Sequence, residues 1–172
     1  LVRDMELGDR QLLGDDLCAC LPGMDADMQA DPSRERRGSL GIMCEMLDHA
    51  RDVDEAVDIL MKYNIDFEGG PPLHYLIADA KGRSVLVEFF RGEMKLTWNE
   101  QPWHFATNFL LASVGNPREA GCWRYNRIDD SLKEKQGLLD AIAAMNLLAE
   151  VEQDNTQWSV VYQMSLGKVS VV

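Results

Sequence analysis

Cysteine and histidine side chains are the groups of this sequence that could act as nucleophiles, bases or metal ligands. They are Cys18, Cys20, Cys44, Cys122, His49, His74 and His104. Zinc sites usually combine a C-x(2–4)-C pair with a second pair downstream, and the Cys18-Ala19-Cys20 spacing does not match this pattern. Residues two apart on a strand point to one face, so we interpret this pair as small buried apolar groups and expect neither a metal nor a cofactor. The few, irregularly spaced cysteines are typical of a reducing compartment, which favours the cytoplasm over the periplasm.

A thiol or hydroxyl paired with a histidine is one way to build a nucleophile, since a base within hydrogen-bond reach can remove its proton. The candidate pairings are His74 with Cys44 or Cys122, and His104 with Ser113. The sequence has no G-x-S-x-G segment, the nucleophile turn of many serine hydrolases. His74 also lies in a strand-like run, where a histidine is typical of a half-buried sheet residue.

Composition and charge bound the class of protein and of partner. The chain has 172 residues, of which 46% are apolar and 27% charged, values that indicate one folded domain. Seventeen Lys and Arg against 29 Asp and Glu give a formal net charge of −12, which would repel nucleic acid and anionic membrane surfaces. No apolar run approaches the roughly 18 residues of a membrane span. We therefore expect neither nucleic acid nor a membrane as a partner.

Residues 1–37 are predicted to form an acidic start followed by a polar loop. Asp and Glu greatly outnumber Lys and Arg in residues 1–31, and only residues 17–21 have the character of a buried strand. Residues 32–38 are polar, rich in arginine and short of core residues, which predicts an exposed loop.

Two helices are predicted next in the chain. The first begins behind a Ser39 cap and carries an apolar stripe at helical spacing: Leu40, Met43, Cys44, Leu47 and Ala50. The second begins at Asp52, with Glu55 three places on as an acidic variant of the capping box, and ends at Asn64. Its expected buried face consists of Val53, Ala56, Val57, Leu60 and Met61.

The second half of the chain changes to strand patterns. Residues 73–80, 84–90 and 94–98 are β-rich runs separated by glycine-centred turns, which predicts an antiparallel meander with four inward-facing residues: Tyr75, Ile77, Val85 and Val87. Residues 104–109 are predicted as a fourth short strand. A helical face follows at Leu138, Ile142, Met145, Leu148 and Ala149, and residues 158–172 form a hairpin around residues 166–168. This order predicts one α+β domain with layered packing over residues 1–172.

Several short segments, taken in their order and spacing, resemble one known family. They are VDEAV at residues 53–57, LHYLIADAKG at 73–82, VE at 87–88, ATN at 106–108, WRY at 123–125 and WSVVY at 158–162. Over about residues 38–172 they are similar to the choloylglycine hydrolase and penicillin V acylase family, and to the neighbouring self-processing acyltransferases, within the N-terminal-nucleophile hydrolases. The resemblance implies an αββα sandwich of two antiparallel sheets between helical layers, with this chain as the larger C-terminal part of that fold.

The resemblance also implies a reaction. Family members hydrolyse a linear amide C–N bond through a cysteine at the mature N-terminus, whose α-amine serves as the base. This chain begins with Leu1, so the resemblance implies a nucleophile segment upstream or on another chain, or a homologue that has lost the chemistry. The implied substrate is a small-molecule amide such as a bile-salt conjugate, penicillin V or an N-acyl amino compound, and the family favours a homo-oligomer. Acyl transfer to an amine, or a non-catalytic binding or scaffold domain, are the alternatives.

Two site residues follow from the family pattern. Asn108, in the Thr-Asn pair, matches the family asparagine whose amide faces the oxyanion of the tetrahedral intermediate. Arg124 matches the family arginine that lies near the nucleophile and holds the polar network of the site. Without this pattern Asn108 is typical of a turn former, and Arg124 of a surface residue that opens a helix, with Arg127 one turn later as its rival.

Other residues have two interpretations. Strand alternation allows Glu88 to face either solvent or a site, and the sequence does not decide between them. Asp79 precedes a glycine turn and is predicted to be a turn residue. The tryptophans could line an acyl pocket, but large apolar residues are usually buried, so we predict core packing for Trp98, Trp103, Trp123 and Trp158.

Overall fold

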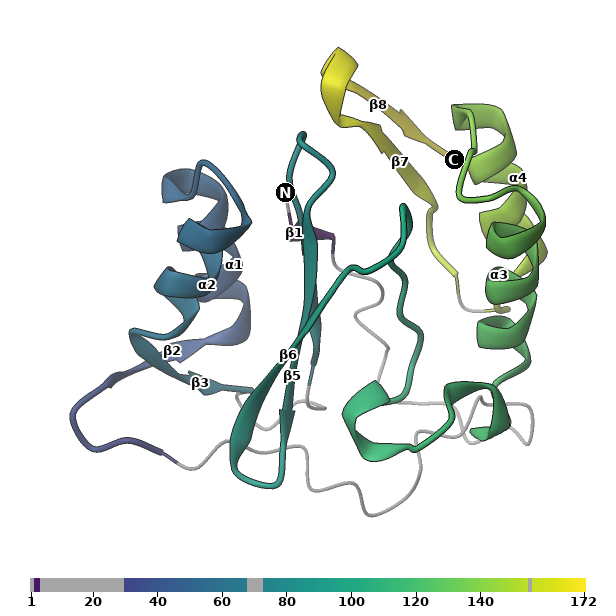
Figure 1. Cartoon of the computed structure of the whole chain (residues 1–172). Coiled ribbons are helices and arrows are strands. Elements are labelled where there is room, and N and C mark those ends of the chain that lie inside the picture. The colour runs from purple at the N-terminus through teal and green to yellow at the C-terminus, as the bar shows by residue number, and fades with distance from the viewer. Residues whose placement is uncertain (1, 4–29, 68–72, 155) are drawn as a thin grey trace.

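A computed structural model describes residues 2–3, 30–67, 73–154 and 156–172, and this part of the chain is a mixed α and β structure (Figure 1). Its helices are α1 (Ser39–His49), α2 (Val53–Leu60), α3 (Trp123–Glu134) and α4 (Ala141–Glu150). Its strands are β1 (Val2–Arg3), β2 (Glu35–Gly38), β3 (Tyr63–Asp66), β4 (Tyr75–Ala78), β5 (Ser84–Phe90), β6 (Glu93–Trp98), β7 (Val160–Gln163) and β8 (Lys168–Val171). The predicted strand at residues 17–21 lies outside the described residues.

The main sheet has the order β1-β4-β5-β6, and each neighbouring pair is antiparallel. The predicted meander is therefore confirmed. Gly82, with φ of +87°, closes the turn between β4 and β5, and Gly92, with φ of +79°, closes the turn between β5 and β6. Glycine is favoured at both positions because it adopts positive φ without a side-chain clash.

One face of this sheet forms the main core. The four residues predicted to face inward are all buried there, and Phe89 extends their row along β5. They pack against α1 and α2, which lie together on one side of the sheet in Figure 1. Period-2 alternation places Ser84, Leu86 and Glu88 of β5 on the opposite face.

The predicted buried face of α1 is right for Met43 and Ala50, which are partly buried against the core, and wrong for its other three positions. Ile42 and Met46 are its buried residues, whereas Leu40, Cys44 and Leu47 are exposed. Positions 42 and 46 lie on the side of a helix opposite to positions 40, 44 and 47, so this sequence carries apolar residues on two faces. Packing against the sheet selects one of them. The predicted Ser39 cap is also wrong, because Gly38 is the N-cap residue and no side chain caps the helix.

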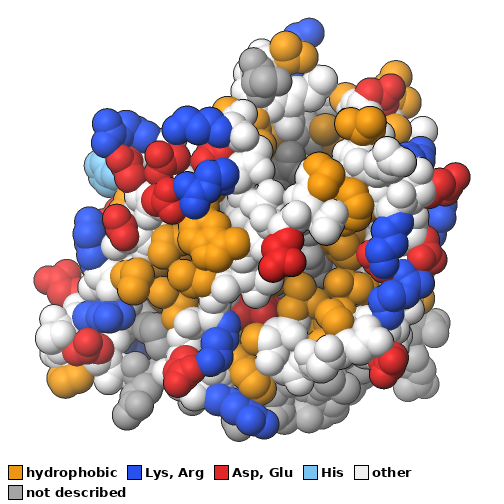
Figure 2. Space-filling view, viewed as in Figure 1, with side chains coloured by type: hydrophobic (Ala, Val, Ile, Leu, Met, Phe, Trp, Pro, Cys, Tyr) orange, Lys and Arg blue, Asp and Glu red, His pale blue; other side chains and the backbone are white. Residues whose placement is uncertain are grey.

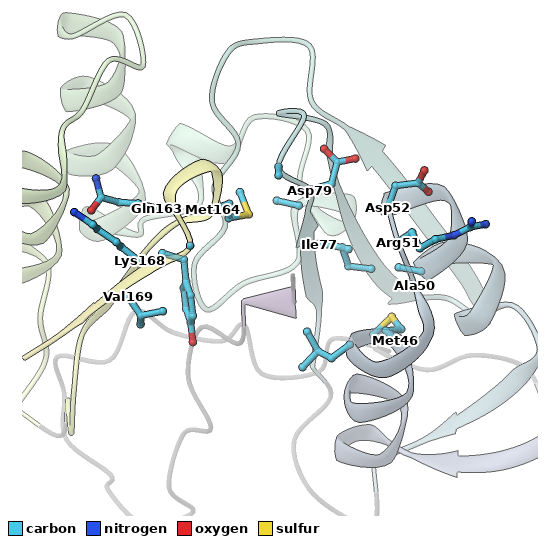
Figure 3. Close-up of a pocket in the computed structure, with 16 residues that line it drawn as sticks. Met46, Ala50, Arg51, Asp52, Ile77, Asp79, Gln163, Met164, Lys168 and Val169 are labelled. Atoms are coloured by element: carbon cyan, nitrogen blue, oxygen red, sulfur yellow. The ribbon is translucent and has the colours of Figure 1, made fainter.

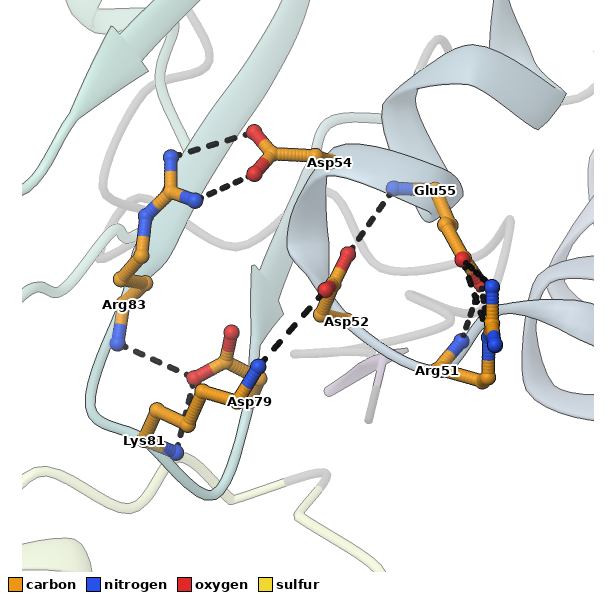
Figure 4. Close-up of polar contacts among 7 residues, drawn as sticks. All are labelled: Arg51, Asp52, Asp54, Glu55, Asp79, Lys81 and Arg83. Atoms are coloured by element: carbon orange, nitrogen blue, oxygen red, sulfur yellow. Dashed lines mark hydrogen bonds and ion pairs between the residues drawn. The ribbon is translucent and has the colours of Figure 1, made fainter.

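The predicted cap of α2 is confirmed. Asp52 accepts a hydrogen bond from the backbone N–H of Glu55 at 3.2 Å. Val53, Ala56, Val57 and Leu60 are buried as expected, whereas Met61 is exposed just beyond the helix and Ile59 is buried in addition. Figure 4 shows how ion pairs surround this helix start, joining Arg83 to Asp54, Lys81 to Asp52 and Arg51 to Glu55.

Residues 35–38 are a strand, not the loop that their polarity predicted. β2 pairs in parallel with β3, from Glu35 opposite Tyr63 to Gly38 opposite Asp66. Most side chains of β2 are exposed, as expected. Backbone hydrogen bonds hold this ladder together, so its polar side chains gave no alternating signal.

Residues 104–109 are buried or half-buried but irregular, so the predicted fourth strand is wrong. Ala106 packs with Leu76 and Leu86 on the second face of the sheet, and Phe105 packs with Ile128 and Leu132 beside α3. The segment thus bridges the sheet and α3. Its apolar pattern reflects burial between these two surfaces, because it pairs with no strand in the described part of the chain.

The C-terminal region leaves much apolar surface open. The predicted hairpin is confirmed as antiparallel β7 and β8, joined by a 3₁₀ turn and Gly167. Helix α4 forms within the predicted region, but it buries no residue, so its expected core face is wrong. Trp98, Trp123 and Trp158 are exposed, which overturns core packing for three of the tryptophans. Figure 2 shows hydrophobic patches among charged side chains on the face in view.

Among the described residues, no helix is both long and apolar enough to cross a membrane.

Candidate functional site

The structure brings the two predicted site residues into direct contact. Arg124, the second residue of α3, donates from Nη1 to Oδ1 of Asn108 at 2.7 Å. The same nitrogen donates to Oε1 of Gln153 at 2.7 Å, and Nε donates to the carbonyl of Val151 at 3.0 Å. Arg124 is only 3% exposed. A charge so deeply buried is stable only where acceptors surround it, as they do here.

The contact orients the side-chain amide of Asn108. A guanidinium donates hydrogen bonds and accepts none, so the amide oxygen must face Arg124 and the amide nitrogen must point away from it. The arrangement presents an N–H donor whose direction is set by a buried cation.

A second contact ties the Asn108 segment to the start of α3. The hydroxyl of Thr107 lies 3.5 Å from Sγ of Cys122, the residue before the helix. The same sulfur accepts from the backbone N–H of Tyr125 at 3.4 Å and so caps the helix. The ring of Tyr125 packs against Phe105 and Phe109, on either side of Thr107. These contacts hold the segment that carries Asn108 against the start of α3, which carries Arg124.

Arg127, the rival to Arg124, lies elsewhere on α3. It is exposed and forms an ion pair with Glu150 of α4. Its role is therefore a surface contact between the two helices. Of the two arginines, the one that directly follows the aromatic Trp123 is buried.

Glu88 is a feature that the sequence left undecided. Its side chain is 0% exposed, so the solvent-facing alternative is wrong. Its Oε1 accepts from the backbone N–H of Leu111 at 2.7 Å, and Oε2 accepts from that of Ala112 at 2.8 Å. His74 lies beside it, with Nδ1 at 3.6 Å from Oε1. The signal for this residue was an acid within an otherwise apolar strand run.

The second histidine of this region is held by a serine. Nδ1 of His104 lies 3.0 Å from Oγ of Ser84 on β5. Burial lowers the pKa of His104, and the charge of Glu88 opposes that shift. Neutral imidazole is therefore favoured at this position. His104 thus contacts Ser84, and His74 contacts Glu88, while Cys44 is exposed on α1.

Asp79 is confirmed as a turn residue. Its Oδ1 accepts from the backbone N–H groups of Lys81 at 2.8 Å and Arg83 at 3.2 Å (Figure 4). This pattern shapes the β4–β5 turn.

A cavity of about 470 Å³ opens between α1, the end of β4 and the β7–β8 hairpin (Figure 3). Met46 and Ile77 line one side, and Met164 and Val169 line the other. Neither Asn108 nor Arg124 lines it, so the cavity does not belong to their site.

Chemically, the Asn108–Arg124 pair can supply a fixed hydrogen-bond donor next to a buried positive charge. Among the described residues, no group of three or more His, Cys, Asp or Glu side chains is arranged to hold a metal ion. Comparisons of the sequence with protein-family models and with curated proteins found no match.

Proposed function

We propose that the protein hydrolyses a linear amide C–N bond of a small molecule through a cysteine acyl-enzyme, with Asn108 as the donor to the oxyanion. The observation that carries the proposal is the hydrogen bond from buried Arg124 to Oδ1 of Asn108. Both residues match positions of a family with this activity, and the match does not depend on their proximity. Two residues of one site must lie close together, and this hydrogen bond joins residues that are 16 apart in the sequence.

The proposed reaction has two stages. A cysteine thiolate attacks the amide carbonyl carbon, a C–S bond forms, and the carbonyl electron pair moves to oxygen. Collapse of this intermediate breaks the C–N bond, and the amine leaves with a proton from the protonated base. Water then attacks the acyl-enzyme, the C–S bond breaks, and the acid and the thiol are released. The cysteine in this proposal is the N-terminal one that the resemblance implies.

Asn108 acts where negative charge develops. An oxyanion is stabilised most by donors whose direction is fixed before reaction, because they need no reorganisation in the transition state. The guanidinium of Arg124 provides that fixed direction, and its charge adds a favourable field in a site of low dielectric constant. Arg124 is the positioning residue in this scheme, because it donates a hydrogen bond to Oδ1 of Asn108.

The fold proposal is the αββα sandwich. The β1-β4-β5-β6 sheet has α1 and α2 on one face, and α3 and α4 lie on the other side of the molecule (Figure 1). In this proposal β7 and β8 are part of the second sheet, between the first sheet and α3–α4. The buried second face of β5 supports it, because Leu86 and Glu88 are covered by the segment that carries Asn108.

The test uses the full-length protein and a panel of amides containing a bile-salt conjugate, penicillin V and an N-acyl amino acid. We expect release of the amine and the acid from at least one, and loss of activity when iodoacetamide labels one cysteine upstream of Leu1. Cys44→Ser is the matched control, because this exposed thiol should not contribute. Transfer of the acyl group to an added amine with no hydrolysis would contradict the hydrolytic step. Absence of turnover and of an acyl-enzyme mass would contradict the whole proposal.

A further inference from the structure

The carboxylate of Glu88 binds the backbone just after Asn108. It accepts hydrogen bonds from the backbone N–H groups of Leu111 and Ala112, at 2.7 and 2.8 Å. These two residues begin a 3₁₀ turn over Leu111–Ser113. No side chain of the preceding residue, Leu110, caps this turn. Both carboxylate oxygens therefore serve as acceptors for the first backbone N–H groups of the turn.

Glu88 and Arg124 therefore hold the same short segment from two sides. Arg124 binds the side chain of Asn108, and Glu88 binds the backbone three and four residues later. Glu88 lies on β5, where it pairs with Lys95 of β6 one residue beyond the last pair with β4, so its backbone is held by the β5–β6 ladder. The position of the segment between these two contacts is therefore fixed relative to both the sheet and α3.

Burying the Glu88 carboxylate costs free energy, which indicates a role beyond packing. A fully buried carboxylate loses its hydration, and hydrogen bonds to it at best offset that loss. An apolar residue at position 88 would fit this buried face of β5 equally well. Leu86, its neighbour on the same face, is such a residue. An apolar side chain would leave two backbone N–H groups without these acceptors.

We propose that Glu88 is a positioning residue for Asn108, acting through the backbone of Leu111 and Ala112. Its effect on turnover rests on the proposed function, but its effect on the position of Asn108 does not. Glu88 lies outside the Asn108–Arg124 pair, and this role requires no contact with substrate.

The first measurement is independent of activity. In full-length protein, Glu88→Gln keeps the size of the side chain but turns an amide NH₂ toward one of the two backbone donors, which removes that hydrogen bond. We expect the side-chain amide NMR signals of Asn108 to shift in Glu88→Gln and to stay in place in Glu93→Gln. Glu93 is the matched control because it is an exposed acid on the adjacent strand. Unchanged Asn108 signals in folded Glu88→Gln would overturn the proposal.

The second measurement is a double-mutant cycle in turnover. A misplaced oxyanion donor should lower kcat by about 10–100-fold with KM nearly unchanged. If Glu88 acts through Asn108, adding Glu88→Gln to Asn108→Ala should lower kcat no further, because the donor is already absent. Additive losses of kcat would overturn the proposal. If the wild-type protein turns over no amide, the proposed function fails, and the NMR result still decides the role of Glu88.

A second variant tests the same contact from the other partner, should Glu88→Gln fail to fold. Leu111→Pro removes the backbone N–H that donates to Oε1 of Glu88. Leu110, with φ of −77° and ψ of 118°, has the extended backbone that suits the residue before a proline. We expect the same shift of the Asn108 signals and the same loss of kcat. Signals at their wild-type positions in folded Leu111→Pro would overturn the proposal.

Discussion

The side chains of Asn108 and Arg124 are joined by a hydrogen bond of 2.7 Å, from Nη1 of the arginine to Oδ1 of the asparagine. The arginine is buried, and it also binds Gln153 and the carbonyl of Val151. One buried cation thus links the irregular segment before α3 to the chain that follows α4. The orientation of the Asn108 amide depends on this link, and so does the local packing.

Arg124→Lys should therefore weaken both the fold and the site. A lysine ammonium is a point charge and cannot reproduce the planar fork that binds Asn108, Gln153 and the carbonyl of Val151. We expect the free energy of unfolding to fall by about 1–3 kcal/mol, because hydrogen bonds to a charged group are lost. Chemical denaturation measures this, with Arg127→Lys as the control on the exposed side of the same helix. Equal, small effects of the two substitutions would contradict the buried network.

Gly137→Ala should destabilise the end of α3. Gly137 has φ of +74°, and a Cβ there would lie 2.7 Å from Cε3 of Trp103. The strained backbone and the displaced ring should together cost more than about 1 kcal/mol. Gly115→Ala is the control, because an added Cβ at Gly115 has no atom within 4 Å. Melting temperatures compare the two, and a drop in Gly115→Ala as large as that in Gly137→Ala would count against this packing.

His104 should make the stability depend on pH. Burial lowers its pKa in the folded state below the ordinary 6.5, so the unfolded chain takes up the proton first as pH falls. The free energy of unfolding should then decrease below pH 6.5 and level off below the folded-state pKa. His104→Gln should lack this contribution, while the acid-induced losses from carboxylates stay common to both proteins. Denaturant unfolding between pH 7.5 and 5, over roughly that window, measures the difference, and parallel curves would contradict it.

The sequence predicted best where local patterns are sufficient. Period-2 alternation and two glycine turns specified the β4–β5–β6 meander, because a one-residue slip would expose its core. The face of α1 was only partly predicted because apolar residues occupy two of its sides, and only the sheet selects between them. The β2–β3 pair was missed because polar strands held by backbone bonds leave no hydrophobic pattern.

The candidate site was predictable only in part. Family resemblance selected Asn108 and Arg124, but their bond joins distant parts of the chain and has no local signal. Glu88 was ambiguous because alternation identifies a face of a strand without showing what covers that face. The residues that cover it, Leu111 and Ala112, belong to an irregular segment, which sequence periodicity does not describe.

The most direct test of the oxyanion role is kcat and melting temperature measured on the same sample of full-length Asn108→Ala. We expect a folded protein whose kcat is lower by about 10²–10³, the loss typical of removing one oxyanion donor. Asn116→Ala is the matched control, because Asn116 caps a 3₁₀ turn by accepting from the N–H of Arg118 at 3.2 Å. It should lower the melting temperature and leave kcat unchanged. An unchanged kcat in stably folded Asn108→Ala would contradict the account.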